Sequence, residues 1–362
     1  MKKSVLALAV LGAFAGAASA QSSVTMFGVV DLNVQTVSNN ERVYGMSTDG
    51  MASSRLGFRG VEDLGGGLKA GFWLEMGLAA DTGRNAGTWG NGTISSTNEN
   101  ALIFNRRSTV SLSNQWGELR LGRDYTATFW SWTVFDPFGT NGVGAATNLA
   151  LGSDLQSALA GSTYGTLVRA NNMVQYILPA GVFGPGLYGQ LQIAAGEGAQ
   201  GNKYWGGRIG YAAGPFDVAG AYGQTDCLDL ACNIDLDNWN IGGSWNFGFM
   251  KLSGFFSSIS ASGNNNDAGR DNWYVGVTAP FGQWNFKASY GGTNGKDLLD
   301  NVDGTQWAIG ADYNLSKRTA LYATWSSINN DNGARFSVSS QASTLEQGAN
   351  STGGQIGIRH TF

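Results

Sequence analysis

The most constraining feature of this sequence is a period-two alternation of apolar and polar residues that recurs along the chain. Between residues 23 and 35 the even positions, such as Val24 and Val34, are apolar or small, whereas the odd positions include Asp31 and Asn33. A segment with this pattern is a β-strand with one apolar and one wet face. The pattern returns in three further segments, 68–75, 283–290 and 355–362. The sequence therefore predicts an all-β fold.

Sixteen alternating segments can be counted, starting near residues 23, 53, 68, 102, 117, 167, 186, 203, 215, 238, 249, 272, 283, 306, 318 and 353. Seven short turns alternate with eight long connections, among them 37–52 and 329–352. Membrane barrels join their strands in this way, with tight periplasmic turns and larger external loops. Lipid cannot hydrogen-bond an open sheet edge, so such a sheet must close, and sixteen strands enclose an aqueous lumen. We expect a 16-stranded antiparallel transmembrane β-barrel over residues 21–362.

The first twenty residues have the pattern of a secretory signal peptide. Lys2 and Lys3 precede an apolar run over residues 5–18, and Ala18-Ser19-Ala20 supplies the small residues of a cleavage site. This run is too short to span a bilayer, which takes a helix of ~20 residues. We therefore expect residues 1–20 to be removed and the mature chain, beginning at Gln21, to be exported.

Composition and charge argue against other classes of protein. Loss of Lys2 and Lys3 changes the formal net charge from −4 to −6, which disfavours a nucleic-acid partner. No phosphate loop or metal cluster stands out, so no cofactor is expected. In an exported chain, Cys227 and Cys232 predict a local disulfide in a loop. The single histidine, His360, is predicted to face outward, away from any serine, and no enzyme activity is expected.

Several stretches resemble the general porins of Gram-negative outer membranes, in particular those of the β-proteobacterial branch. These stretches are VTMFGVVDLNV, SRLGFRGVEDLGGGLKAGFWLE, NRRSTVSLSNQWGELRLGRDY, RANNMVQYILP and the final GIRHTF. The resemblance implies a homotrimer in outer-membrane lipid, with the first and last strands at the subunit contact, that passes ions and small hydrophilic solutes. It also implies that Phe362 is read by the outer-membrane insertion machinery. The plainer interpretation of Phe362 is an interfacial aromatic anchor.

The longest connection in the N-terminal half, residues 126–166, is too apolar for a solvated external loop. By resemblance, the third long loop folds into the barrel and narrows the channel, and Asp136-Pro137-Phe138-Gly139 resembles its turn, although here the acid precedes the proline. The acids of this loop are Asp136 and Asp154, which we assign to the constriction.

Strand parity places a set of arginines on the opposite, inward-facing wall. The clearest members are Arg55, Arg59, Arg120 and Arg169. Arg106 and Arg107 are adjacent, so only one of them is expected to face the lumen. The family resemblance favours Arg106, whereas the polarity of Thr109 and Ser111 favours Arg107, and both alternatives stay open. Arg123 shares the outward parity of its neighbours and is expected at the rim or the subunit contact.

An arginine wall opposite an inward loop predicts a channel that prefers anions, because guanidinium groups stay charged and set a fixed field. The alternative for each arginine is an ordinary lumen residue paired with an acid from the set Glu62, Glu75, Glu118 and Asp124. Two other functions stay open. A substrate-specific channel would show an aromatic track, for which Trp73 and Tyr188 are candidates, and an adhesin or structural barrel would fill its lumen.

Overall fold

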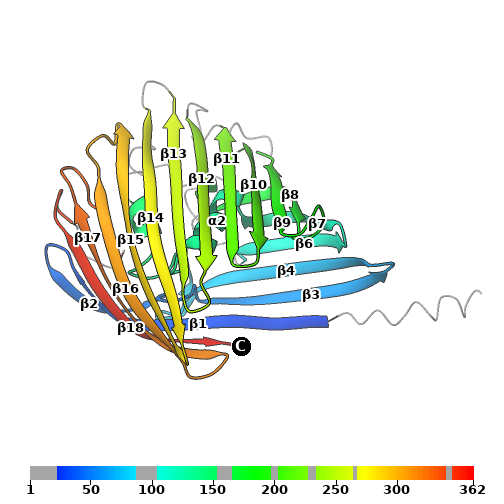
Figure 1. The fold of residues 1–362 in the computed structure, drawn as a ribbon, viewed down its shortest axis with the longest axis horizontal. Coiled ribbons are helices and arrows are strands. Elements are labelled where there is room, and N and C mark those ends of the chain that lie inside the picture. The colour runs from blue at the N-terminus through cyan, green and yellow to red at the C-terminus, as the bar shows by residue number, and fades with distance from the viewer. Residues whose placement is uncertain are drawn as a thin grey trace, which may run out of the picture.

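The computed structural model describes residues 23–86, 104–152, 165–196, 203–226, 234–263, 267–339 and 345–362, and is dominated by β-sheet (Figure 1). The strands are β1 (Ser23–Ser38), β2 (Arg42–Thr48), β3 (Arg55–Gly65), β4 (Leu68–Ala79), β5 (Arg84–Asn85), β6 (Arg107–Asn114), β7 (Gly117–Tyr125), β8 (Arg169–Leu178), β9 (Leu187–Ala194), β10 (Lys203–Ala213), β11 (Phe216–Asp226), β12 (Asp235–Asn246), β13 (Lys251–Ser262), β14 (Ala268–Phe281), β15 (Trp284–Asp297), β16 (Gly304–Asn314), β17 (Thr319–Asn330) and β18 (Ser351–Thr361). The predicted signal peptide, Asp154, Cys227 and Cys232 lie outside the described residues.

These strands form a closed antiparallel barrel with sixteen strand positions in its wall. β2 and β3 lie end to end against β1 and occupy one position, and β5 is a short extension paired only with the end of β4. β18 closes the ring against β1, from Val29 opposite Thr361 to Ser38 opposite Thr352. The last residue completes this seam, because Gly28 and Phe362 exchange two backbone hydrogen bonds of 3.1 Å. The predicted sixteen-stranded barrel is confirmed.

The first long connection differs from the sequence expectation. Residues 37–52 were expected to form a loop, but β1 continues to Ser38 and β2 returns beside it from Arg42 to Thr48. The side chains of Tyr44 and Met46 point away from the barrel and are exposed, so the outward face of the hairpin stays apolar. Backbone pairing thus extends the wall past the predicted end of the strand.

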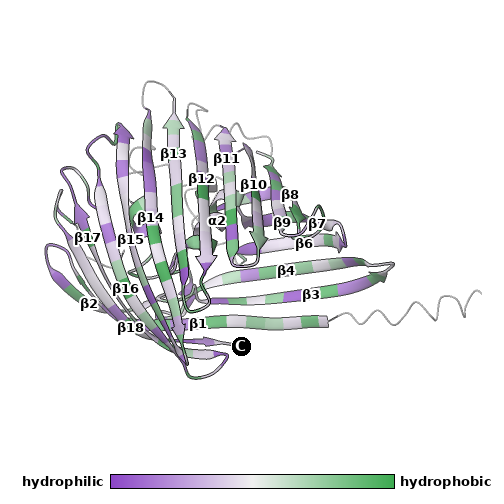
Figure 2. Ribbon diagram, in the orientation of Figure 1, coloured by the Kyte–Doolittle hydropathy of each residue, from purple (hydrophilic) through white to green (hydrophobic). Residues whose placement is uncertain are grey.

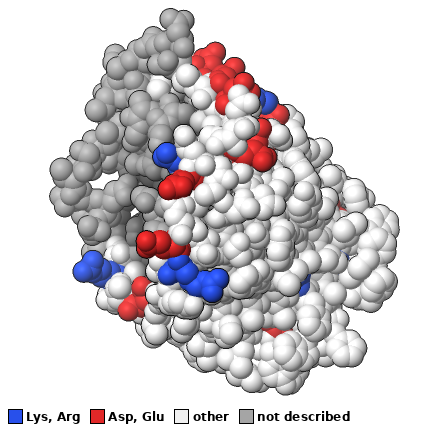
Figure 3. All heavy atoms as spheres, turned by 90° about the vertical axis from the view of Figure 1, so that its left-hand side faces the viewer, with Lys and Arg blue, Asp and Glu red and all other residues white. Residues whose placement is uncertain are grey.

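The two faces of the wall have opposite character, and Figure 2 shows hydrophilic and hydrophobic bands alternating along the strands. Val24 is 69% exposed on the outside of β1, whereas Asp31, Asn33 and Gln35 of the same strand are buried against the inside. Most of the strand surface in Figure 3 carries no charge, and acidic side chains gather along its upper edge. Among the described residues, no helix has the length and apolarity needed to cross a bilayer.

The described residues of the third long loop, 126–152 and 165–168, lie inside the barrel and contain α2 (Ala127–Phe135), α3 (Thr147–Ala150) and a 3-10 turn (Gly165–Leu167). α2 packs against β9 to β13, and α3 packs against β14 to β16. Trp132 and Phe135 of α2 are buried among Phe255 and Tyr274 of the barrel wall. The apolar composition of this loop is explained by that packing, and its inward fold is confirmed.

One buried carboxylate holds the segment between β2 and β3 in place. Asp31 of β1 accepts hydrogen bonds from the backbone amides of Gly50, Met51 and Ala52 at 3.1, 2.9 and 2.8 Å, and from the hydroxyl of Tyr322 on β17. A charged acceptor contributes more to the free energy of unfolding than a neutral one. Loss of this carboxylate would also leave three buried N–H groups without a partner.

We predict that Asp31→Asn destabilises the barrel, because an amide NH₂ would face backbone N–H donors that the carboxylate now satisfies. The expected loss is about 3 kcal/mol, or roughly 5–10 °C in unfolding temperature, measured in detergent by circular dichroism. Asp81→Asn, in the loop after β4, is the matched control. Equal unfolding temperatures for the two variants would contradict this role.

Candidate pore constriction

The inward wall from β3 to β8 carries a cluster of arginines arranged around one carboxylate. Glu75 on β4 accepts a hydrogen bond of 2.7 Å from Nε of Arg106 and lies 3.5 Å from Nη1 of Arg55. Its second oxygen accepts the indole N–H of Trp73 at 3.1 Å. Glu75 therefore positions two guanidinium groups while neutralising one charge.

Tyr125, at the end of β7, joins two arginines that approach from different elements. Its hydroxyl accepts a hydrogen bond of 3.1 Å from Nη2 of Arg106, and the guanidinium carbon of Arg169 lies 4.3 Å from the centre of its ring. Nε of Arg169 donates to the backbone carbonyl of Arg106 at 3.0 Å. Arg106 and Arg169 are 7% and 4% exposed. Glu75 and the Tyr125 hydroxyl fix Arg106, whereas a ring and a carbonyl fix Arg169.

Arg106 and Arg107 both point inward, and the expectation that only one of them could do so was wrong. β6 begins at Arg107, so the alternation that separates neighbouring side chains does not yet apply to Arg106, which lies in a bend. Arg107 lies 3.5 Å from Asp124 and 4.5 Å from the ring centre of Trp73. Both alternatives drawn from the sequence are therefore correct, since Arg106 and Arg107 both face the lumen.

The remaining predicted arginines lie at different points of the same wall. Arg120 pairs with Glu118 at 2.9 Å and with Asp124 at 2.6 Å. Arg59 lies over the rings of Phe27 and Trp73 at 5.3 and 5.2 Å. All six predicted arginines thus lie on this wall. Three carboxylates, Glu75, Glu118 and Asp124, lie on the same wall.

Arg123 does not lie unpaired on the outer surface. Its Nε donates to the carbonyl of Asn105 and its Nη1 to the side chain of Asn171, both at 2.6 Å. The pairing of β7 with β8 shifts register between Gly122 and Asp124, and Asn172 has a φ of 54°, typical of a bulge. The bulge explains why counting alternate residues wrongly predicted that Arg123 faces outward.

Asp136 organises the third loop instead of presenting its charge to the channel. Its carboxylate is buried and accepts hydrogen bonds from the backbone amides of Phe138, Thr140 and Ala146 at 2.9, 3.0 and 3.1 Å. Burial raises the pKa of the Asp136 carboxyl above its ordinary value, and the three amide donors act in the opposite direction. The structure thus places this predicted constriction residue inside the fold of the loop.

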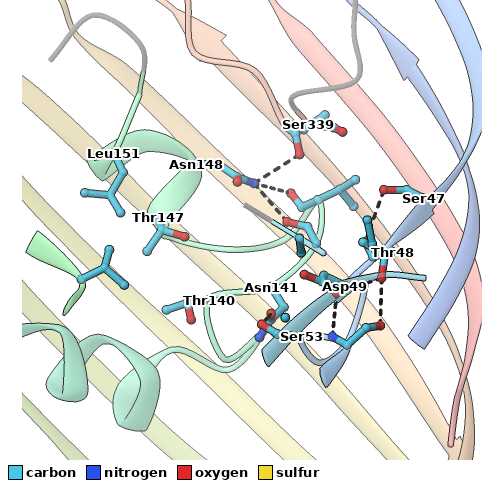
Figure 4. A pocket seen from close by; sticks show the side chains of 18 of the residues that line it. Ser47, Thr48, Asp49, Ser53, Thr140, Asn141, Thr147, Asn148, Leu151 and Ser339 are labelled. Atoms are coloured by element: carbon cyan, nitrogen blue, oxygen red, sulfur yellow. Dashed lines mark hydrogen bonds between the residues drawn. The ribbon is translucent and has the colours of Figure 1, made fainter. Parts of the chain in front are cut away.

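A cavity of about 750 Å³ opens beside the arginine cluster and is lined by several separate parts of the chain (Figure 4). Thr140, Asn141 and Asn148 of the third loop face Thr48 and Asp49 across it. Arg106 and Arg169 line the same space. The candidate constriction therefore lies between the inward loop and the arginine wall.

Another side of the cavity is formed by residues 335–339 of the last loop, which joins β17 to β18 and was expected to be external. Phe336 and Val338 are buried against Val143 and Leu149 of the third loop. The sequence signal for this packing was the pair of large apolar residues Phe336 and Val338 in the connection. Tyr125 was likewise missed, because the sequence does not show that two arginines meet there.

Comparison with known proteins places this arrangement in a family. The sequence profile of the Gram-negative porin family matches residues 7–333. Outer membrane porin protein 32 of Delftia acidovorans is 36% identical, with 100% of both chains covered. An outer membrane porin protein of Bordetella pertussis is 28% identical, also with 100% of both chains covered.

Solved structures agree with the sequence matches. The anion-selective porin from Comamonas acidovorans superposes with a TM-score of 0.80 at 33% identity, covering 94% of this chain and 100% of that one. OmpT of Vibrio cholerae, in its trimer form, superposes with a TM-score of 0.65 at 13% identity, covering 94% and 99%, and shows the shared fold alone. The chain therefore belongs to the Gram-negative porin family and is a multi-pass β-barrel of the outer membrane.

Proposed function

We propose that this porin forms a water-filled channel for passive diffusion of ions and small hydrophilic solutes, and that it prefers anions. The observation that carries the proposal is the charge of the wall, where six arginines face the three carboxylates Glu75, Glu118 and Asp124. Aromatic rings contact Arg59 and Arg169, so positive charge exceeds negative charge within this set. The anion-selective porin from Comamonas acidovorans, similar over its whole length, supports the same preference.

The geometry accounts for how the wall would act on a passing ion. Arginine keeps its proton at every relevant pH, so the positive charge of the wall does not depend on pH. Arg106 is held by Glu75 and by the hydroxyl of Tyr125. Arg169 is held by the ring of Tyr125 and by the backbone carbonyl of Arg106, and these two contacts do not cancel its charge. The third loop brings the opposite surface close, with Thr140 and Asn141 as neutral polar groups. An anion therefore meets fixed positive charge where the lumen is narrowest.

Two other functions are weighed by particular contacts. An aromatic track would mark a substrate-specific channel, but Trp73 lies on β4 among arginines and Tyr188 lies on β9, where its hydroxyl contacts Asp217 and Arg208. The strands β6, β7 and β8 separate them. An adhesin or structural barrel would fill its lumen, whereas a cavity of about 750 Å³ lies beside the arginines. Both observations favour the diffusion channel.

The proposed assembly is a homotrimer whose contact includes the first and last strands. The exposed tryptophans of the described strands all lie between β10 and β17, namely Trp205, Trp239, Trp245, Trp284, Trp307 and Trp325. Tryptophan is enriched where a wall meets the lipid headgroups. The exposed positions of β1 are aliphatic, as in Val24, Met26 and Val34. This asymmetry supports a lipid face at β10 to β17 and a subunit face around β1.

We predict that single charge changes at the wall shift ion selectivity in opposite directions. Arg169→Gln is expected to lower the anion-to-cation permeability ratio by more than about fivefold, because one unit charge at ~4 Å in water changes the energy of an anion by about 1 kcal/mol and that of a cation by the same amount in the opposite direction. Glu75→Gln is expected to raise it, because Arg55 and Arg106 lose their shared counter-ion. The reversal potential of purified protein in a planar bilayer under a salt gradient measures both.

Arg42→Gln, at the exposed end of the hairpin formed by β1 and β2, serves as the charge-matched control. Its reversal potential is expected to equal that of the unmodified channel. A cation-preferring unmodified channel, or shifts of the same sign in Arg169→Gln and Glu75→Gln, would refute the proposed role of the wall.

Phe362 is proposed to serve both barrel closure and recognition by the insertion machinery. Its ring lies against Gly28, where any Cβ would overlap it. We predict that deletion of Phe362 sharply lowers the amount of folded barrel in the outer membrane, scored by heat-modifiable migration on gels. Phe362→Tyr keeps the ring and should assemble normally. Purified deleted chain that refolds in detergent as well as the full chain would assign the defect to recognition, whereas failure there too would assign it to closure.

A further inference from the structure

Arg59 differs from the other arginines of the wall in how it is held. The guanidinium lies 5.3 and 5.2 Å from the ring centres of Phe27 and Trp73, which themselves pack at 4.8 Å. Within the described part of the chain, no carboxylate lies within 4.0 Å of it and no hydrogen bond uses its N–H groups. Its side chain is exposed, whereas Arg106 and Arg169 are buried. Arg59 therefore presents to the lumen a guanidinium that two rings position and whose N–H groups are available to a ligand.

Arg59 lies away from the constriction, on the periplasmic side. β3 runs from Arg55, beside Glu75, towards the short turn that joins it to β4. Arg59 is four residues further along the strand, about 13 Å at ~3.3 Å per residue. Trp73, which lies opposite Arg59 in the pairing of β3 with β4, also carries Arg107 at 4.5 Å from its ring centre. One indole thus positions two guanidinium groups below the narrowest point.

Aromatic contacts hold Arg59 without using its hydrogen-bond donors, whereas Arg107 also donates from Nε to the hydroxyl of Thr109. A cation–π contact attracts the whole guanidinium to the ring face and leaves its five N–H groups directed sideways. A planar carboxylate can accept two parallel N–H bonds from such a group. Arg106 cannot offer this geometry, because its Nε and Nη2 are already donated to Glu75 and Tyr125.

We infer that Arg59, placed by Phe27 and Trp73 and assisted by Arg107, forms a second anion station on the periplasmic side of the constriction, and that it binds small carboxylates transiently. The inference rests on the proposed channel function and adds a site to it. An anion entering from the periplasm meets this station before the constriction. An anion entering from outside meets Arg106 and Arg169 first. The two directions of entry are therefore chemically different.

The test measures block of chloride current by citrate, added to one side of a planar bilayer and then to the other. In Arg59→Gln, the blocking constant for citrate added to the periplasmic side is expected to rise roughly two- to fivefold, as for the loss of a single exposed ion pair. The constant for the other side should stay at the unmodified value. Arg318→Gln, in the short turn before β17, removes the same charge on the same side of the membrane and should change neither constant.

A second variant, Arg59→Lys, keeps the charge but loses the planar fork, and its blocking constant should fall between those of the unmodified channel and Arg59→Gln. It carries the test on its own if Arg59→Gln does not fold. Unchanged constants on both sides, or equal rises on both sides, would overturn the second station. Either result in a channel that still prefers chloride leaves the proposed function standing, whereas a cation-preferring unmodified channel would count against the function itself.

Discussion

Closure of the hydrogen-bonded ring is the constraint from which the rest of this molecule follows. A strand inside a bilayer finds partners for its amides and carbonyls only in the next strand, so the sheet must return to its first member. Here the return is made by β18 against β1, down to the exchange between Gly28 and Phe362. A ring of sixteen strands is too wide for its own side chains to fill. The third loop, packed along β9 to β16, supplies the narrowing that the wall cannot.

The same wall must hold positive charge in place without cancelling it. A carboxylate for every arginine would remove the field, and no partner at all would leave the side chains disordered. The structure uses a mixture, in which Glu75 and Asp124 each serve more than one arginine and the rings of Tyr125 and Trp73 hold others. Aromatic rings and backbone carbonyls attract a cation as dipoles or quadrupoles, so the net charge of the wall survives the contacts that order it.

Strand number, strand position and the inward third loop could be predicted from the sequence, because alternation and apolar composition are local properties. Parity also placed Arg55, Arg59, Arg120 and Arg169 correctly on the inner wall. It failed where the backbone leaves the regular strand, at Arg106 in a bend and at Arg123 beside a bulge. Asp136 could not be placed from its charge alone, since its partners are backbone amides within its own loop. The last loop was misplaced because its two apolar contacts join residues nearly two hundred positions apart.

Asp31 connects the order of assembly to the shape of the pore mouth. Its ligands are the amides of residues 50–52, made early in synthesis, and the hydroxyl of Tyr322, made near the end. Thr48, Asp49 and Ser53 beside that segment line the cavity. The complete set of bonds can form only once β17 and β18 have come alongside β1. An incompletely assembled chain therefore lacks the bond from Tyr322 to the carboxylate that holds residues 50–52 at the mouth of the pore.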